Sequence, residues 1–153
     1  MAAATLVASA VGILILVITA YVVMGGTITL SETVTTSQKA LVGQEAARLH
    51  TRVEITGASV VDALKVAFLE VKNTGSETVR NPDEMGLILL HSGEPVFYTN
   101  SSGTWWYRIS PDAIHPGQLD PDEVMNISVT YTAVAPTWAK VVTGNGMYDS
   151  AYL

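Results

Sequence analysis

The sequence contains no cysteine among its 153 residues, which excludes disulfide bonds, thiolate metal sites and a thiol nucleophile. It also has no charged side chain before Glu32, so all 14 acidic and 8 basic residues lie in the later part of the chain. Their formal sum of −6, without a cluster of Lys and Arg, would repel phosphate backbones. We therefore expect no nucleic-acid binding. A chain of this length has room for one domain besides an anchor.

The uncharged opening is also the most apolar part of the chain. Between residues 6 and 24 the only polar side chains are small hydroxyls and the Tyr21 phenol. About 20 helical residues, at about 1.5 Å each, match the hydrocarbon thickness of a bilayer. We predict a transmembrane helix over residues 1–26. Its predicted anchor residues are Leu6, Val11, Ile13, Leu14, Ile15, Leu16, Val17, Ile18, Val22 and Val23.

A cleaved signal peptide and a buried helix of a soluble protein are the alternatives to this anchor. A signal peptide would carry a basic segment before the apolar run, and no Lys or Arg precedes Leu6. A soluble core helix would show a polar stripe, which this run lacks. For orientation, Lys39 favours a cytoplasmic C-terminal part. The sequons beginning at Asn100 and Asn126 favour an external one, with both asparagines as candidate glycosylation sites.

The chain after the apolar run changes its pattern once. Apolar residues at helical spacing, together with alanines, predict a helical stalk over residues 27–52. Short apolar runs separated by turn residues then predict a β-sandwich over residues 53–153. The predicted strands are 53–59, 64–72, 85–90, 96–98, 104–109, 124–132 and 138–143, with a short eighth strand after Gly146. In the run from Val124, Asn126 and Ser128 alternate with apolar residues, which puts the second sequon on a wet face.

No group of residues in the chain predicts catalysis. The three histidines, His50, His91 and His115, stand in separate segments, and we expect them to face solvent rather than bind a metal. The acidic residues between 120 and 123 are oxygen ligands of the kind that calcium prefers. Their spacing matches no calcium loop, so we expect a solvated turn. The sequence accordingly predicts no enzyme activity, no cofactor and no metal.

The densest aromatic group is Trp105, Trp106 and Tyr107, in the fifth predicted strand. Because side chains alternate across a strand, one tryptophan would enter the core while its neighbour faces solvent. An exposed tryptophan is a favoured anchor in protein contacts, so these three residues form a candidate partner-contact group. Packing in the core is the alternative interpretation.

Several short motifs follow the apolar helix in a recognisable order. They are Arg48-Leu49-His50-Thr51-Arg52-Val53-Glu54-Ile55, Leu69-Glu70-Val71-Lys72-Asn73-Thr74-Gly75, Leu119-Asp120-Pro121-Asp122-Glu123 and Val141-Val142-Thr143-Gly144-Asn145-Gly146. In this arrangement the chain resembles the archaellum (archaeal flagellum) accessory proteins of the F and G type, and more closely the F type. The likeness covers almost the whole chain.

The resemblance implies a mainly β protein, in which an N-terminal transmembrane and stalk α-helix precedes an immunoglobulin-like β-sandwich. It implies a single-pass protein of the cytoplasmic membrane of an archaeon, with the sandwich outside, that anchors the stator of the motility machinery to the surface layer. The implied partners are the surface-layer protein, a G-type stator partner and further copies of the chain.

Two other functions remain open at this point. A pilin-like subunit of an archaeal filament is the first, although bacterial type IV pilins carry Glu at the fifth mature position, where this chain has Thr5. A membrane-tethered enzyme or solute-binding domain is the second, and it would require a pocket with convergent polar groups.

Overall fold

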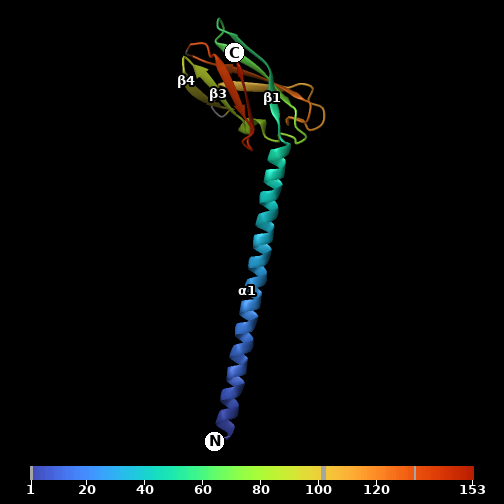
Figure 1. The fold of residues 1–153 in the computed structure, drawn as a ribbon, viewed down its shortest axis with the longest axis vertical. Coiled ribbons are helices and arrows are strands. Elements are labelled where there is room, and N and C mark those ends of the chain that lie inside the picture. The colour runs from blue at the N-terminus through green and yellow to red at the C-terminus, as the bar shows by residue number, and fades with distance from the viewer. Residues whose placement is uncertain (1, 101–102, 133) are drawn as a thin grey trace. The chain divides into compact units, whose positions relative to one another are not determined.

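The computed structural model describes residues 2–100, 103–132 and 134–153, without the side chains of residues 2–5, 27 and 29–31. The chain forms two compact units, Met1–Gly43 and Gln44–Leu153. Over the described residues, one long helix and eight strands follow one another (Figure 1). They are α1 (Ala2–His50), β1 (Val53–Val61), β2 (Val66–Asn73), β3 (Gly86–His91), β4 (Glu94–Thr99), β5 (Trp105–Ile109), β6 (Val124–Thr130), β7 (Trp138–Val142) and β8 (Tyr148–Tyr152), with a 3₁₀ turn, η1 (Pro82–Glu84).

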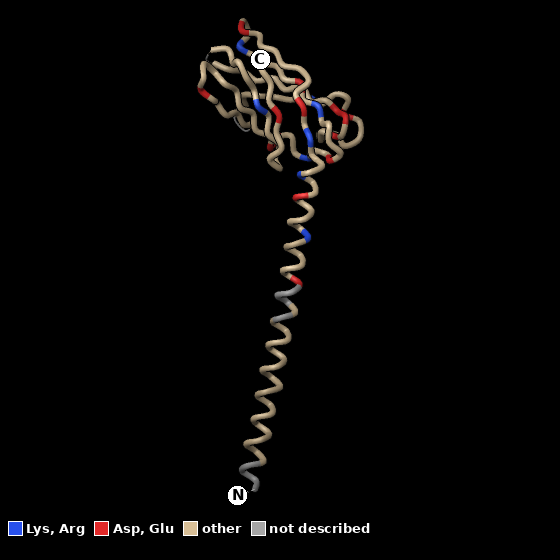
Figure 2. Tube along the Cα trace, viewed as in Figure 1, with Lys and Arg blue, Asp and Glu red and all other residues tan. Residues whose placement is uncertain are grey.

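The N-terminal unit consists of helix α1. Its segment Leu6–Gly26, with 21 residues and a mean hydropathy of 2.7, is long and apolar enough to cross a membrane, and its side chains are exposed. The Ser9 hydroxyl donates to the Leu6 carbonyl at 2.9 Å and the Thr19 hydroxyl to the Ile15 carbonyl at 2.7 Å. These hydroxyls are therefore satisfied within the helix, as an apolar surrounding requires. Figure 2 shows charged residues only on the C-terminal part of α1 and on the strands and loops.

The eight strands form two antiparallel four-stranded sheets, ordered β1-β2-β6-β5 and β4-β3-β7-β8. The expected fold class, an apolar helix followed by a mainly β sandwich, is confirmed. Most strand ends differ from the prediction by one or two residues, and the β1–β2 turn is one example. β1 runs to Val61 and β2 begins only at Val66, because residues 62–65 form the turn between them. There Lys65 takes a φ of 54° and its ammonium lies 2.7 Å from the Asp62 carboxylate.

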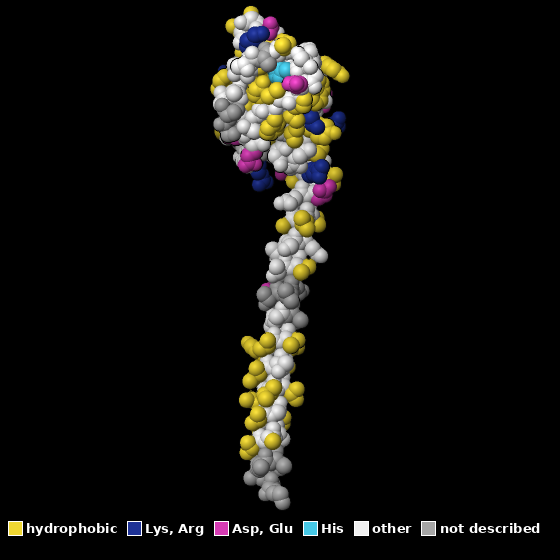
Figure 3. All heavy atoms as spheres, turned by 90° about the vertical axis from the view of Figure 1, so that its left-hand side faces the viewer, with side chains coloured by type: hydrophobic (Ala, Val, Ile, Leu, Met, Phe, Trp, Pro, Cys, Tyr) yellow, Lys and Arg dark blue, Asp and Glu magenta, His cyan; other side chains and the backbone are white. Residues whose placement is uncertain are grey.

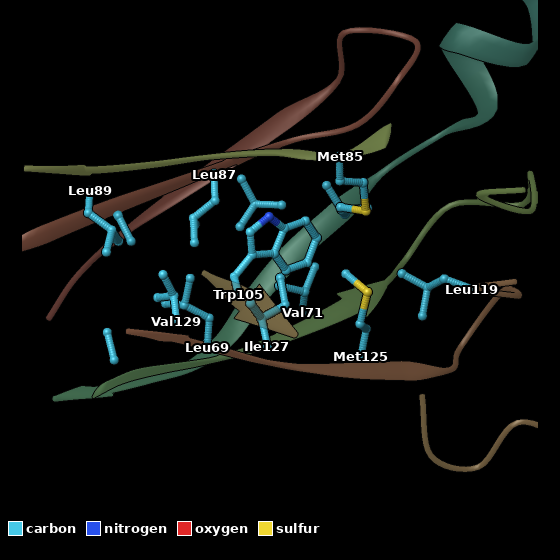
Figure 4. Packing of buried hydrophobic residues seen from close by; sticks show 14 of the residues in the cluster. Leu69, Val71, Met85, Leu87, Leu89, Trp105, Leu119, Met125, Ile127 and Val129 are labelled. Carbon is cyan, nitrogen blue, oxygen red and sulfur yellow. The ribbon is translucent and has the colours of Figure 1, made fainter. Parts of the chain in front are cut away.

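The core lies between the inner faces of the two sheets. Leu87 and Leu89 of β3 point toward Leu69 of β2 and Val129 of β6, and the Trp105 ring lies between the layers (Figure 4). Inward residues are spaced by two along each strand, as a sheet that is buried on one face requires. In β2 and β6 the buried apolar positions are Ala67, Leu69, Val71, Met125, Ile127 and Val129.

The last turn of α1 is tied to two loops within the unit Gln44–Leu153. The His50 carbonyl accepts hydrogen bonds from the backbone N–H groups of Ser76 and Glu77, at 2.9 and 3.2 Å. These bonds satisfy a carbonyl that the helix end leaves without a helical partner. A Cβ on Gly75 would collide with the His50 carbonyl oxygen, so glycine is required where the loop passes the helix end. From the second loop, Asn145 donates to the Thr51 hydroxyl at 2.7 Å.

Asn73 organises the first of these loops. Its side-chain N–H₂ donates to the carbonyls of Glu77 and Leu119, both at 2.9 Å, and its side-chain oxygen accepts from the Gly75 N–H at 3.0 Å. The residue is fully buried, so each of these bonds replaces water that the side chain has lost. The Asn-Thr-Gly motif at residues 73–75 is therefore a structural element that holds the turn beside the helix end.

Candidate partner-binding surface

The predicted aromatic contact group lies on strand β5, and its residues alternate between the two faces of the sheet. Trp105 is 1% exposed and belongs to the core, whereas Trp106 is 52% exposed on the outer face. Tyr107 points to the inner side with Trp105, with ring centroids 5.9 Å apart, and is half-buried. A partner cannot reach Trp105 in this fold, so Trp105 is removed from the predicted contact group, and of the two tryptophans only Trp106 is open to solvent.

A further exposed apolar surface lies on the other sheet, where no contact group was predicted. The strand register aligns outward side chains in three rows across β4, β3, β7 and β8. We call the outer surface formed by these rows the apolar face. Its rows are Pro95, Leu90, Trp138 and Tyr152; Phe97, Ile88, Lys140 and Ser150; and Thr99, Gly86, Val142 and Tyr148.

Large side chains on this face are open to solvent. Phe97 is 62% exposed, Tyr148 60% and Tyr152 86%, while Ile88 and Trp138 are half-buried between them. Hydrophobic side chains gather on the side of the sandwich that carries β3 and β4 (Figure 3). Contiguous exposed apolar patches of this kind are typical of protein or membrane contact sites rather than of an isolated soluble surface.

Lys140 is the one charged side chain among the twelve positions of the apolar face. Its ammonium lies 3.6 Å from the centroid of the Tyr148 ring, which is cation–π geometry. The aliphatic stem of Lys140 therefore contributes to the apolar face, while its ammonium group lies over Tyr148 of the edge strand β8. The apolar face thus presents a hydrophobic centre and a single fixed positive group.

Gly86 makes room for the ring of Phe97 on the same face. A Cβ at Gly86 would lie 2.7 Å from the Cε2 atom of Phe97, so the ring packs directly on the glycine backbone. A hollow opens beside this ring, lined by Phe97, Val142 and Gly144 among others. A side chain of a partner has a place to insert there, as central interface anchors do.

The outer surface of the sheet β1-β2-β6-β5 has a different chemistry, and we call it the polar face. Its register aligns Ser59, Phe68, Ser128 and Trp106 in one row, and Gly57, Glu70, Asn126 and Arg108 in the next. Two aromatic rings thus stand among hydroxyl, amide and charged groups of both signs. Of the two candidate glycosylation sites, Asn126 lies exposed on this face. Asn100 is half-buried and its amide donates to the Asp83 carboxylate, and Ser101 and Ser102 of its sequon lie outside the described residues.

The expectation of a solvated acidic turn is wrong for Asp120 and Glu123, which are 1% and 5% exposed. The Asp120 carboxylate accepts hydrogen bonds from the Thr78 hydroxyl at 2.7 Å and from the backbone N–H and ring Nδ1 of His115, both at 2.9 Å. Burial raises the pKa of Asp120, but these hydrogen bonds outweigh it and hold the pKa below its ordinary value. Glu123 accepts from the backbone N–H groups of Ala113 and Asp120. The acidic residues therefore fasten loops together.

The expectation of a solvent-facing side chain is also wrong for His91, which is 5% exposed. Its Nδ1 lies 2.6 Å from the Val134 carbonyl oxygen and its Nε2 3.2 Å from the Tyr98 hydroxyl. The strand parity could have revealed this, because His91 follows Leu87 and Leu89 at a spacing of two and shares their inward face. Within the described part of the chain, no three His, Asp or Glu side chains are grouped so that they could hold a metal ion.

The apolar face has a signature in the sequence of two strands, β3 and β7. The strand Gly86–His91 is apolar at nearly every position, and Trp138–Val142 is interrupted only by Lys140. A strand that is apolar on both sides has a second surface to cover besides the core. Which neighbours share that surface depends on strand order, and strand order could not be deduced from the sequence pattern.

Comparisons of the sequence with known proteins give one relative without an assigned function. No family model matches the sequence. The chain is 29% identical over 152 residues to an uncharacterized protein of Archaeoglobus fulgidus, with 96% of this chain and 92% of that protein covered.

Two solved structures from Sulfolobus acidocaldarius share the fold. One is the archaellum periplasmic stator protein FlaG, with a TM-score of 0.53 and 17% identity, covering 67% of this chain and 99% of that one. The other is the archaellum periplasmic stator protein complex of FlaF and FlaG, with a TM-score of 0.52 and 16% identity, covering 67% of this chain and 89% of that one. At the level of the fold, the predicted resemblance to archaellum stator proteins is confirmed.

Proposed function

We propose that this chain is a membrane-anchored structural component of the archaeal motility machinery, of the stator type and closer to the F type. The observation that carries the proposal is the apolar face, which lies on a sandwich that has the fold of archaellum stator proteins. A stator component must hold other proteins against torque. A broad apolar surface on a hydrogen-bonded sheet, with side chains fixed by the register, suits such a contact.

The proposed partner of the apolar face is a second stator sandwich of the G type. The solved complex of FlaF and FlaG concerns two other proteins, and it supports the idea that domains of this fold pair with each other. The chemistry of the face defines what the partner must offer. Its surface should be apolar at the centre, with an acidic or aromatic group opposite Lys140, because the lysine would otherwise be buried without a counter-charge.

The proposed topology puts residues 1–26 in the cytoplasmic membrane as a single-pass anchor, residues 27–52 in a helical stalk and residues 53–153 outside the membrane. The apolar segment of α1 with its internally bonded hydroxyls supports the anchor. The sequence resemblance supports the external location. In this proposal the sandwich meets the surface-layer protein, and further copies of the chain associate with it, so that the stator is fixed to the cell envelope.

The proposed role is structural rather than catalytic. Within the described part of the chain, the buried side chains of Asp120, Glu123 and His91 each form hydrogen bonds with nearby loops or side chains. Asp120 and Glu123 are hydrogen-bonded neighbours in one loop, whereas His91 lies at the end of β3 with other partners. The three groups do not converge on one pocket with a nucleophile and a base, which catalysis would require.

Affinity purification of the full-length chain from detergent-solubilised native membranes tests the proposal. We expect a second stator-type sandwich protein to co-purify, together with surface-layer protein, and the chain to remain with the envelope after shearing. The alternative, a pilin-like filament subunit, is favoured by the apolar N-terminal helix of the chain. It predicts that the chain appears in sheared filaments, and that result would contradict the stator proposal.

A further inference from the structure

Asn126 stands at the centre of the polar face, among groups that recognise sugars. In the register, Asn126 of β6 lies between Glu70 of β2 and Arg108 of β5. The next outward residue of β6, Ser128, lies between Phe68 and Trp106. All four neighbours of the Asn-Ile-Ser sequon on this face are therefore either a ring or a charged hydrogen-bonding group.

Two aromatic side chains of the polar face are open to solvent. Phe68 is 41% and Trp106 52% exposed, and they are separated by one intervening strand. Strands about 4.8 Å apart put the two backbones about 10 Å from each other. Two shallow hollows flank the sequon. One is lined by Ser59, Phe68, Glu70 and Asn126, and the other by Phe68, Trp106, Arg108, Asn126 and Ser128.

This combination suits a carbohydrate better than a protein surface. A pyranose ring has an apolar C–H side, which packs on an aromatic ring, and a rim of hydroxyls, which need donors and acceptors. Phe68 and Trp106 supply the rings, whereas the Glu70 carboxylate and the Arg108 guanidinium supply an acceptor and a donor set. The apolar face has rings as well, but its only charged group is held over Tyr148.

We propose that Asn126 carries an N-linked glycan whose first sugars pack on Phe68 and Trp106, so that the polar face is covered by the protein's own glycan. In the transfer, the Nδ2 nitrogen bonds to the anomeric carbon of a sugar, and the bond from that carbon to the phosphate of a lipid-linked donor breaks. The lipid phosphate leaves with the bonding electrons, and the amide loses one proton to a base of the transferase. The inference rests on the proposed external location of the sandwich.

Mass spectrometry of the full-length protein purified from its native membranes tests the modification. We expect the peptide that contains Asn126 to carry a sugar mass, and Asn126→Gln and Ser128→Ala to remove the same mass. Ser59→Ala, on the same face but outside the sequon, is the control and should leave the mass unchanged. Protease added outside the membrane shows whether the sandwich is external. If the sandwich is digested and Asn126 is nevertheless unmodified, this inference is overturned and the proposed function still stands.

Thermal unfolding then tests the packing of the sugars. Phe68 and Trp106 are both replaced by Ala in two backgrounds, the glycosylated protein and Asn126→Gln, which lacks the glycan. The double replacement should lower the Tm about 3 °C more in the glycosylated protein, because only there do the rings lose contact with a sugar. Phe97→Ala, on the apolar face, should lower both by the same amount. If the two ring substitutions lower the Tm equally in the glycosylated protein and in Asn126→Gln, the sugars do not pack on these rings, and the assigned packing is overturned.

Discussion

The two outer faces of the sandwich have the same geometry and opposite chemistry. Each consists of four antiparallel strands with side chains aligned in cross-strand rows. The face of β4-β3-β7-β8 carries aliphatic and aromatic groups with one lysine, whereas the face of β1-β2-β6-β5 carries hydroxyl, amide and charged groups around two rings. Each sheet therefore offers a four-stranded outer surface, and in our proposals the outward residues suit one surface to a protein and the other to a glycan.

The first test of this comparison separates the core from the apolar face within one strand. Leu89 is fully buried and Leu90, its neighbour, lies half-buried on the apolar face. Leu89→Ala should lower the free energy of unfolding by about 3 kcal/mol, because it leaves a cavity. Leu90→Ala should lower it by about 1 kcal/mol, because less apolar area is lost. Urea unfolding of the two variants measures the difference, and equal losses would mean that Leu90 is covered within the free chain.

The second test exchanges a ring for a charge on each face. Phe97→Glu puts a carboxylate into the proposed protein contact, and it should weaken partner binding at least about 30-fold, or about 2 kcal/mol. Phe68→Glu is the matched control on the polar face and should leave partner affinity unchanged. Titration of the full-length variants with the co-purified partner measures both. A greater loss of affinity for Phe68→Glu would show that the partner binds the polar face and not the apolar face.

The third test adds one methyl group to each face. Gly86→Ala puts its Cβ 2.7 Å from the Cε2 atom of Phe97, so the ring must move and partner affinity should fall about fivefold, or roughly 1 kcal/mol. Gly57→Ala meets the Glu70 carboxylate oxygen at 2.9 Å, and that flexible side chain can turn aside. It should bind the partner normally. Unchanged affinity of Gly86→Ala would indicate that the position of the Phe97 ring does not matter to the partner.

The fourth test uses acid, which should not distinguish the faces at all. The pKa of Asp120 is held below its unfolded value of 3.8, so the folded protein binds fewer protons than the unfolded chain does. Stability from this carboxylate is therefore complete above about pH 5 and is lost as the pH falls through the folded pKa. Urea unfolding at pH 7, 5 and 3 should show the loss only at pH 3. Asp120→Asn should reduce that acid-dependent loss, and an equal loss in the variant would show that another group is responsible.

Most of the fold could be predicted because its signals are local. The alternation in β6 and the turn residues between strands specify eight strands, and the uncharged run specifies the apolar helix. The outer faces could not be assigned, since they depend on which strands become neighbours. Trp138 and Phe97 are 41 residues apart in the sequence, and the strand order β4-β3-β7 brings them to one surface. The buried positions of Asp120 and Glu123 were missed for a similar reason, because their partners come from other loops.

Site-specific photo-crosslinking in intact cell envelopes tests the central claim most directly. A photoreactive residue at position 97 of the full-length chain lies on the apolar face, and one at position 106 lies on the polar face. The account predicts that position 97 captures a second stator-type sandwich protein and that position 106 does not. Capture of that protein from position 106 alone, or from neither position while it still co-purifies with the chain, would contradict the account.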